Sequence, residues 1–119
     1  MRAAVIRHTL RSWVSVLSVC LAVTGAPSAS TDGGPRIATL DWTIAETLIA
    51  LDARLVGLAQ VDGYESWVAE PAVPDAVLDL GLRAQPNLEQ LVGLDPDRIA
   101  LSPMFASLAP RLETVAPVT

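Results

Sequence analysis

Arg83 is the side chain with the clearest capacity for ligand chemistry in this 119-residue chain. It follows a short apolar stretch, residues 76–80, and Trp67 lies in the segment before that stretch. A guanidinium keeps its charge and presents several N–H donors in a fixed plane, which suits anionic or oxygen-rich groups. A neighbouring aromatic ring supplies an apolar wall. This pair of residues therefore predicts a binding site for an anionic or oxygen-rich ligand.

The elements that would position these side chains alternate between strand and helix. Apolar runs predict strands, and periodic apolar residues with capping signals predict the helices between them. The predicted strands cover residues 36–41, 55–59, 76–80 and 98–101, and the predicted helices cover residues 44–51, 88–92 and 106–115. Residues 117–119 resemble the start of a fifth strand. Apolar strands alternating with helices predict an α/β fold with an open, mostly parallel sheet and flanking helices.

Local signals predict where these helices begin and end. Thr43 is the predicted cap of the first helix, with Glu46 as its capping-box partner. Asn87 is the predicted cap of the second helix, which we expect to end at Gly93. Pro110 is expected in the first turn of the third helix or as an interruption of it. Residues 63–70, with one helical turn at most, 81–86 and 102–105 are predicted as loops.

Aromatic and polar side chains follow the predicted strands. In open α/β sheets, ligands bind beyond the carboxyl ends of the strands. The side chains at those ends are Trp42, Tyr64, Trp67, Arg83, Ser102 and Phe105. We therefore expect Trp42, Trp67, Arg83, Ser102 and Phe105 to form the ligand-binding site.

Each of these residues also has a purely structural interpretation. Trp42 could close the end of the core, because burial is the usual fate of tryptophan. Arg83 could form a surface salt bridge with Asp79 or Glu89, which contributes little to stability. Phe105 could serve packing alone.

Catalysis and metal binding find little support in the sequence. There is no glycine-rich dinucleotide motif, no P-loop and no G-x-S-x-G nucleophile motif. His8 and Cys20, the one histidine and the one cysteine, both lie in the first 30 residues. The remaining chain therefore offers no histidine–serine catalytic pair and no histidine or thiolate metal site. We expect a binding protein without enzymatic activity, metal site or cofactor.

The charge distribution argues against two classes of partner. The formal net charge is −5, all eight basic residues are arginines, and three of these precede residue 12. Residues 31–119 therefore carry a net charge of −8, because they hold the five other arginines and all thirteen acidic residues. Nucleic acids and anionic membrane surfaces bind clustered basic residues, so neither is expected as a partner.

The first 30 residues have the layout of a secretory signal peptide. A basic region precedes an apolar run over residues 12–25, and small residues follow. An uncleaved membrane anchor is the alternative, although the run is short for a membrane span. We therefore expect residues 1–30 to be a signal peptide, residues 31–119 to be an α/β lobe, and the product to be periplasmic.

Residues 35–119 resemble the N-terminal lobe of the periplasmic ferric hydroxamate (ferrichrome-type) siderophore-binding proteins. The resemblance rests on five segments: residues 36–42 (RIATLDW), 46–51 (ETLIAL), 67–71 (WVAEP), 74–75 (PD) and 81–89 (GLRAQPNLE). The last two are characteristic of the hydroxamate branch, whereas vitamin B12-binding and haem-binding relatives share the general plan.

The resemblance implies a two-lobed binding protein that delivers a ferric siderophore to an inner-membrane ABC permease and acts as a monomer. Arg83 would donate hydrogen bonds to the hydroxamate oxygens, and Trp42 and Trp67 would form the aromatic wall. Iron would be bound only through the siderophore. Phe105 stands where the family has a tyrosine, and the linking helix and second lobe have no counterpart, so the lobe would be incomplete. Two alternatives stay open: the same fold binding cobalamin or haem, and an orphan lobe acting as a protein-interaction module.

Overall fold

Four parallel strands form the central sheet of the computed structural model, which describes residues 33–119. Their bounds are β1 Ile37–Thr39, β2 Leu55–Leu58, β3 Leu78–Asp79 and β6 Arg98–Ala100. The spatial order is β3-β2-β1-β6, and all three neighbouring pairs are parallel. Val118 continues the sheet beyond β6 through a parallel bridge to Ile99. The predicted α/β fold with a mostly parallel sheet is confirmed, whereas the predicted signal peptide, residues 1–30, lies outside the described residues.

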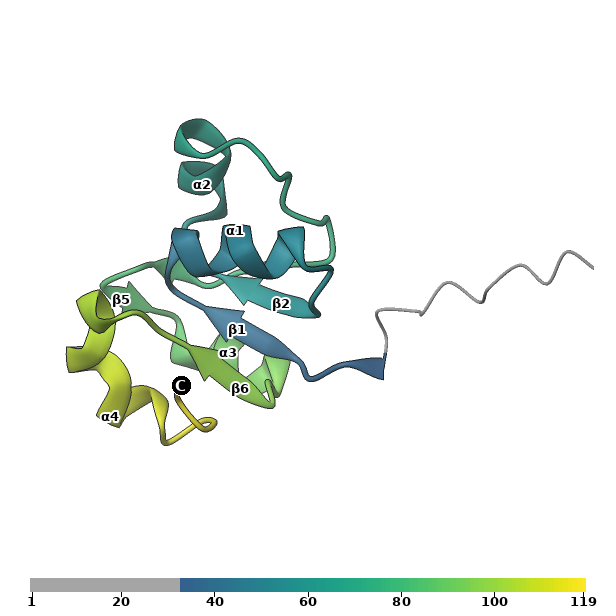
Figure 1. The fold of residues 1–119 in the computed structure, drawn as a ribbon. Helices are drawn as coiled ribbons and strands as arrows, with labels where there is room; N and C mark the ends of the chain where they lie inside the picture. Colours follow the sequence, from purple (N-terminus) through teal and green to yellow (C-terminus); the bar gives the residue numbers. More distant parts are fainter. Residues whose placement is uncertain (1–32) are drawn as a thin grey trace, which may run out of the picture.

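Helices cover both faces of this sheet (Figure 1). They are α1 Trp42–Ala50, α2 Val61–Trp67, α3 Leu88–Leu94, the 3₁₀ helix η2 Pro103–Leu108 and α4 Ala109–Leu112. On one face, Ala45 of α1 packs with Leu58 and Tyr64 in one apolar cluster. On the other face, Leu91 of α3 packs in a second cluster with Leu40 and other buried side chains. Burial on both faces explains why the strand sequences are almost continuously apolar.

Helix α1 begins two residues earlier than predicted, at Trp42 instead of residue 44. Its N-cap is Asp41, whose Oδ1 accepts the backbone N–H of Thr43 at 2.8 Å and that of Ile44 at 3.4 Å. The predicted cap at Thr43 is therefore wrong, because Thr43 already lies inside the helix. The first strand was predicted to end at Asp41, whereas β1 ends at Thr39.

Helix α2 replaces most of a predicted loop. Its N-cap residue, Gln60, has a left-handed backbone with φ 51° and makes no side-chain capping bond. The N–H of Val61 instead donates to the carboxylate of Asp79 at 3.1 Å. The acceptor at the start of α2 is 18 residues away in sequence, so no local capping signal announces this helix.

Helix α3 begins as predicted, with Asn87 accepting the N–H of Gln90 at 3.0 Å. The predicted end at Gly93 is wrong, because the helix continues to Leu94 and Asp95 adopts the left-handed conformation. Arg36 donates to the carbonyl oxygen of Leu94 at 2.7 Å and to that of Asp95 at 3.2 Å. These bonds satisfy carbonyl groups that a helix end leaves unpaired.

The other differences concern the predicted loops and the last helix. Residues 81–86 form a small antiparallel hairpin, β4 Gly81–Leu82 with β5 Gln85–Pro86, and β3 is shorter than predicted. The predicted helix over residues 106–115 is instead η2 followed by the one-turn α4, and η2 also covers most of the predicted loop at residues 102–105. Pro110 lies in the first turn of α4, as one of the predicted alternatives has it.

Candidate functional site

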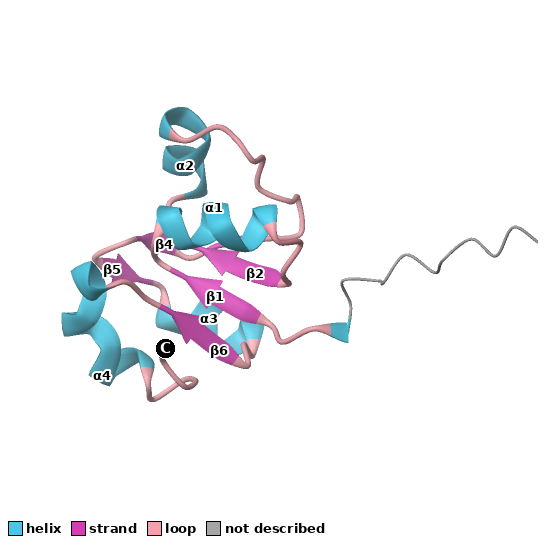
Figure 2. Ribbon diagram, in the orientation of Figure 1, coloured by secondary structure: helices cyan, strands magenta, loops and turns pink. Residues whose placement is uncertain are grey.

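Hairpin β4–β5 lies at the carboxyl ends of the parallel strands (Figure 2). Arg83 and Ala84 form the two-residue connection between β4 and β5. The hairpin is fixed by backbone bonds from Gln60 N–H to the Gly81 carbonyl at 2.8 Å and from Asn87 N–H to the Leu80 carbonyl at 2.7 Å. Gly81 has φ 81°, a left-handed conformation that glycine adopts without steric cost. The base of the hairpin therefore holds Arg83 in a defined position.

Asp79 ties this hairpin to helix α2. One carboxylate oxygen accepts the N–H of Gly81 at 2.8 Å, and the other accepts the N–H of Val61 at 3.1 Å. Across residues 33–119, Arg83 forms no ion pair, so the salt bridge with Asp79 or Glu89 is not present. Both carboxylate oxygens of Asp79 thus bind backbone N–H groups, and neither binds the guanidinium of Arg83.

The guanidinium of Arg83 contacts two aromatic rings. Its Cζ lies 4.4 Å from the centroid of Trp42 and 5.1 Å from that of Phe105. One Nη approaches the sulfur of Met104 at 4.0 Å. The Nε atom is buried and has no hydrogen-bond partner among the described residues. Cation–π contacts of this kind contribute about 0.5–2 kcal/mol and leave the N–H donors available.

Trp42 and Phe105 serve the core and the site together. Trp42 is the first residue of α1, is half-buried, and donates its Nε1–H to the carbonyl of Ala59 at 3.1 Å. Phe105 is buried in the core cluster beneath η2. Each ring is therefore held by packing and also contacts Arg83, whereas a role of either ring in ligand binding stays a prediction.

Trp67 and Ser102 are not among the side chains that form ring or hydrogen-bond contacts with the Arg83 guanidinium, although the Ser102 carbonyl accepts the N–H of Phe105 at 3.0 Å. Trp67 is the last residue of α2 and exposes 83% of its surface. Ser102 precedes η2, and its hydroxyl oxygen is buried without a partner in the described part of the chain. The structure thus brings Trp42, Arg83 and Phe105 into contact, whereas the cation–π contacts of Arg83 do not include Trp67.

Met104 is not among the predicted ligand residues, although it contacts Arg83. Met104 is 75% exposed and lies beside Arg83 because the tight 3₁₀ turn of η2 follows β6 directly. The sequence signal for it was its place next to Phe105. The exposed side chains of Met104 and Leu82 add apolar surface next to Arg83.

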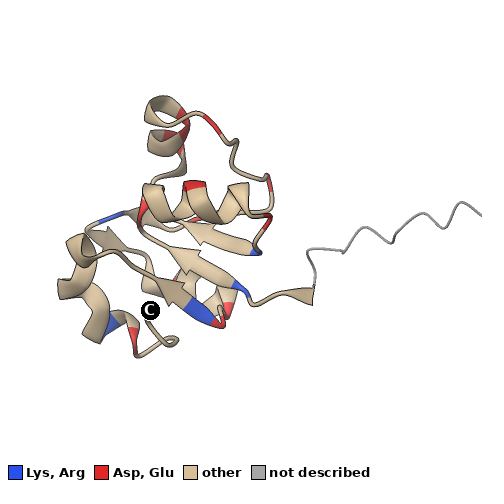
Figure 3. Ribbon diagram, viewed as in Figure 1, with Lys and Arg blue, Asp and Glu red and all other residues tan. Residues whose placement is uncertain are grey.

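Arginines are distributed unequally between the two ends of the strands (Figure 3). Arg36, Arg54 and Arg98 precede or begin strands β1, β2 and β6, at the end opposite the hairpin. At the hairpin end, Asp62 and Asp79 line a cavity of about 250 Å³ with Gln60, Gly63, Gly81 and Leu82. None of the predicted ligand residues lines this cavity. The hairpin end of the strands therefore carries Arg83 together with at least two carboxylates, and it has no excess of positive charge.

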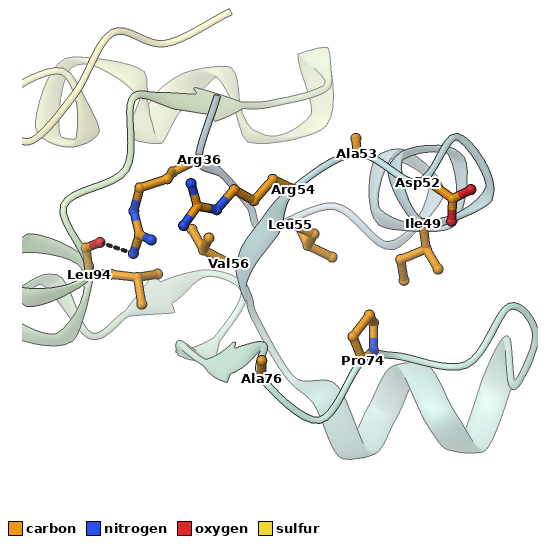
Figure 4. Close-up of a pocket in the computed structure, with 10 residues that line it drawn as sticks. All are labelled: Arg36, Ile49, Asp52, Ala53, Arg54, Leu55, Val56, Pro74, Ala76 and Leu94. Carbon is orange, nitrogen blue, oxygen red and sulfur yellow. Dashed lines mark hydrogen bonds between the residues drawn. The ribbon is translucent and has the colours of Figure 1, made fainter. Parts of the chain in front are cut away.

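A larger cavity, of about 410 Å³, lies at the opposite end of the strands (Figure 4). Its walls include Ile49, Leu55, Pro74 and Leu94, together with Arg36 and Arg54. None of the predicted ligand residues lines it. Arg36 is engaged there by the carbonyl groups at the end of α3, so its role is structural.

Tyr64 anchors the segment that follows α2. Its side chain is fully buried, and its hydroxyl donates to the carbonyl of Pro71 at 2.8 Å. Burial raises the pKa of Tyr64 above its ordinary value of 10.0, and the charges of Glu46 and Glu70 raise it further. Tyr64 therefore stays neutral at physiological pH and serves as an internal support for α2.

Residues 33–119 contain neither a cluster of metal-binding side chains nor a membrane-spanning helix. No group of three or more histidine, cysteine, aspartate or glutamate side chains there could hold a metal ion. Over the same residues, no helix has the length and apolar character required to cross a membrane.

Comparison with known proteins gives one matching family and several relatives. The family model described as periplasmic binding protein matches residues 37–119. The iron(3+)-hydroxamate-binding protein FhuD of Escherichia coli strain K12 is 39% identical over 82 residues, which are 69% of this chain and 28% of that protein. The ferric-anguibactin-binding protein FatB of Vibrio anguillarum is 28% identical over 69% of this chain and 25% of its own length.

A solved structure extends the comparison to the fold. The siderophore-binding protein FhuD from Vibrio cholerae, solved with Fe³⁺–Desferal, has a TM-score of 0.69 and 35% identity. The match covers 71% of this chain and 32% of that structure. The chain thus spans between a quarter and a third of the length of these relatives. The resemblance noted from the sequence is confirmed.

Proposed function

Because the chain belongs to the periplasmic binding protein family, we propose that it captures a ferric siderophore for an ABC importer, with a preference for hydroxamates. Residues 31–119 would form the N-terminal lobe of the ligand groove. The ligand would lie against the carboxyl ends of the strands, with Arg83 donating to the oxygens that surround the iron. Delivery of the ligand in the periplasm to an inner-membrane permease, a monomeric state, and the absence of a cofactor or enzymatic activity belong to the same proposal.

The state of Arg83 is the observation that carries this proposal. Its guanidinium rests on two rings, its Nε is buried without a partner, and the described residues offer it no carboxylate. A buried polar group without a partner costs about 1–3 kcal/mol, which a ligand oxygen would relieve. Charge-assisted bonds from arginine to anionic oxygens are among the stronger hydrogen bonds in proteins.

The low net charge of the site supports hydroxamates over catecholates. Three singly charged hydroxamates neutralise iron(III), whereas three doubly charged catecholates leave a large negative charge on the complex. A single arginine would not balance a strongly anionic ligand at an end of the strands that also carries Asp62 and Asp79. The exposed surfaces of Trp67, Leu82 and Met104 suit the apolar linkers of a neutral complex.

Tryptophan fluorescence provides the test, because the Trp42 ring contacts Arg83 and the exposed Trp67 would face the ligand in the proposed site. The chain is titrated with the ferric complex of Desferal, a trihydroxamate. A parallel titration of free N-acetyltryptophanamide corrects the fluorescence for light that the complex absorbs. Saturable quenching is expected. Arg83→Ala removes charge-assisted bonds worth about 1.5–3 kcal/mol, so the dissociation constant should rise roughly tenfold to a hundredfold.

Arg111→Ala is the matched control, because Arg111 is exposed on α4 and is not among the residues that contact Arg83. It removes the same charge and should leave the affinity unchanged. Iron-free Desferal and a ferric tris-catecholate serve as competitors and should compete poorly. The absence of saturable quenching with every ferric hydroxamate tested would contradict the proposal. Equal losses of affinity in Arg83→Ala and Arg111→Ala would mean that Arg83 contributes only through the net charge of the protein.

A further inference from the structure

Gly63 of helix α2 lies against the indole ring of Trp42. A Cβ atom built on Gly63 would lie 2.6 Å from Cζ2 and 2.9 Å from Cη2 of that ring, closer than carbon atoms can approach without displacement. The ring has little freedom to withdraw, since its Nε1–H is bonded to the Ala59 carbonyl at 3.1 Å. A side chain of any size at position 63 would therefore move Trp42, α2 or both.

The need for glycine at this position comes from close contact rather than from the backbone. Gly63 does not have a positive φ, so other residues could adopt its conformation. Glycine is unfavourable inside a helix, and α2 already lacks a side-chain cap from its own N-cap residue. The helix itself thus gains nothing from a glycine, while the packing against Trp42 requires one.

The ring that Gly63 touches is the one that supports Arg83. The Arg83 guanidinium lies 4.4 Å from the Trp42 centroid and 5.1 Å from that of Phe105, so Gly63, Trp42, Arg83 and Phe105 form a continuous series of contacts. On α2, Trp67 follows Gly63 by four residues and therefore lies on nearly the same helix face. The contact at Gly63 sets both the place of the guanidinium and the distance between α2 and Trp42.

We propose that Gly63 is a positioning residue of the ligand site, which sets the location of the Arg83 guanidinium through the Trp42 ring. The effect of Gly63 on ligand affinity rests on the proposed function, whereas its effect on the position of the Arg83 guanidinium can be measured without ligand. The selectivity of the site would depend on this contact, because a displaced guanidinium presents its donors to a different set of ligand oxygens.

The buried Nε–H of Arg83 reports this geometry directly. Its NMR signal is shifted by the ring currents of Trp42 and Phe105, and its assignment follows from its loss in Arg83→Ala. Gly63→Ala should move this signal and weaken binding of the ferric Desferal complex at least several-fold. Gly93→Ala is the matched control, because Gly93 is also inside a short helix and a Cβ there meets nothing within 4 Å. It should change neither quantity.

Trp42→Phe provides the rescue, because phenylalanine lacks the Cζ2 and Cη2 atoms that the new methyl group would strike. In that background, Gly63→Ala should produce no further change in the Arg83 signal or in stability. If Gly63→Ala alone does not fold, the folded double variant identifies the Trp42 contact as the cause.

Three outcomes would overturn the positioning role: an unmoved Arg83 signal in folded Gly63→Ala, an equal movement in Gly93→Ala, or failure of the double variant to fold while Trp42→Phe folds. Absence of ferric Desferal binding in every variant, wild type included, would instead refute the proposed function and leave the NMR result to decide the role of Gly63.

Discussion

Asp41→Ala should destabilise the lobe much more than Thr43→Ala, although the sequence favours Thr43 as the cap. Asp41 is 6% exposed, and its Oδ1 accepts two N–H groups of the first turn of α1. Loss of such a cap costs about 1 kcal/mol, with a range of about 0.5–2 kcal/mol. The first turn holds no acidic residue, so Asp41 also supplies the charge that the helix N-terminus favours, worth about 0.3–1 kcal/mol.

Together these contributions predict a loss of about 2 kcal/mol for Asp41→Ala. In a domain of this size, that loss corresponds to a decrease in melting temperature of roughly 8–16 °C. Asp41→Asn keeps the acceptor and removes the charge, so it should lose about 0.3–1 kcal/mol. Thr43 is exposed, and its replacement by alanine should change stability by less than about 0.5 kcal/mol.

Urea unfolding followed by far-UV circular dichroism measures these differences, and tryptophan fluorescence reports on the site in the same samples. Trp42 is the first residue of α1, so loss of the cap should also loosen its ring and weaken the contact with Arg83. A Thr43→Ala variant that loses as much stability as Asp41→Ala would refute the assignment of Asp41 as the cap.

Two further predictions concern the core. Leu91→Ala should lower the free energy of unfolding by about 2–5 kcal/mol, because Leu91 is fully buried on the core side of α3. Val92→Ala, at a position 59% exposed, should lower it by less than about 0.5 kcal/mol in the same urea assay. Tyr64→Phe should lose about 0.5–1.5 kcal/mol near neutral pH with the bond to Pro71. Because burial raises the pKa of Tyr64 in the folded state, its contribution is complete below pH 10.0 and is lost as the pH rises above that value. The wild type should therefore show an alkaline decline in urea midpoint that is reduced in Tyr64→Phe, and parallel declines would contradict this account.

The parts of the fold that were predicted correctly depend on local sequence. Strands β1, β2 and β6 could be predicted because most of their residues are apolar and lie in the core, and Asn87 bonds to an N–H three residues away. Helix α2 was missed because the acceptor at its start, Asp79, comes from a distant segment. Hairpin β4–β5 was missed because glycine and proline at its ends disfavour strands, while its stability comes from bonds to neighbouring segments.

The candidate site shows the same division. Parallel strands place their carboxyl ends at one edge, so Trp42, Arg83 and Phe105 could be assigned to a common location from sequence alone. Their stacking could not, because it depends on side-chain conformations and on the space that Gly63 leaves for the indole ring. The choice between a salt bridge and a ring contact for Arg83 likewise required knowing that Asp79 bonds to two backbone N–H groups.

The ring contacts explain how Arg83 can keep unpaired N–H donors, available to the proposed ligand, in apolar surroundings. A carboxylate partner would have to be displaced before the guanidinium could bind ligand oxygens, and breaking a buried ion pair costs about 3–5 kcal/mol. Trp42 and Phe105 instead hold the cation with about 0.5–2 kcal/mol each and occupy none of its donors. Because the rings are fixed by the core, the guanidinium loses little further freedom when it binds. In the proposed site, the affinity for oxygen ligands would therefore depend on the aromatic support as much as on the charge of Arg83.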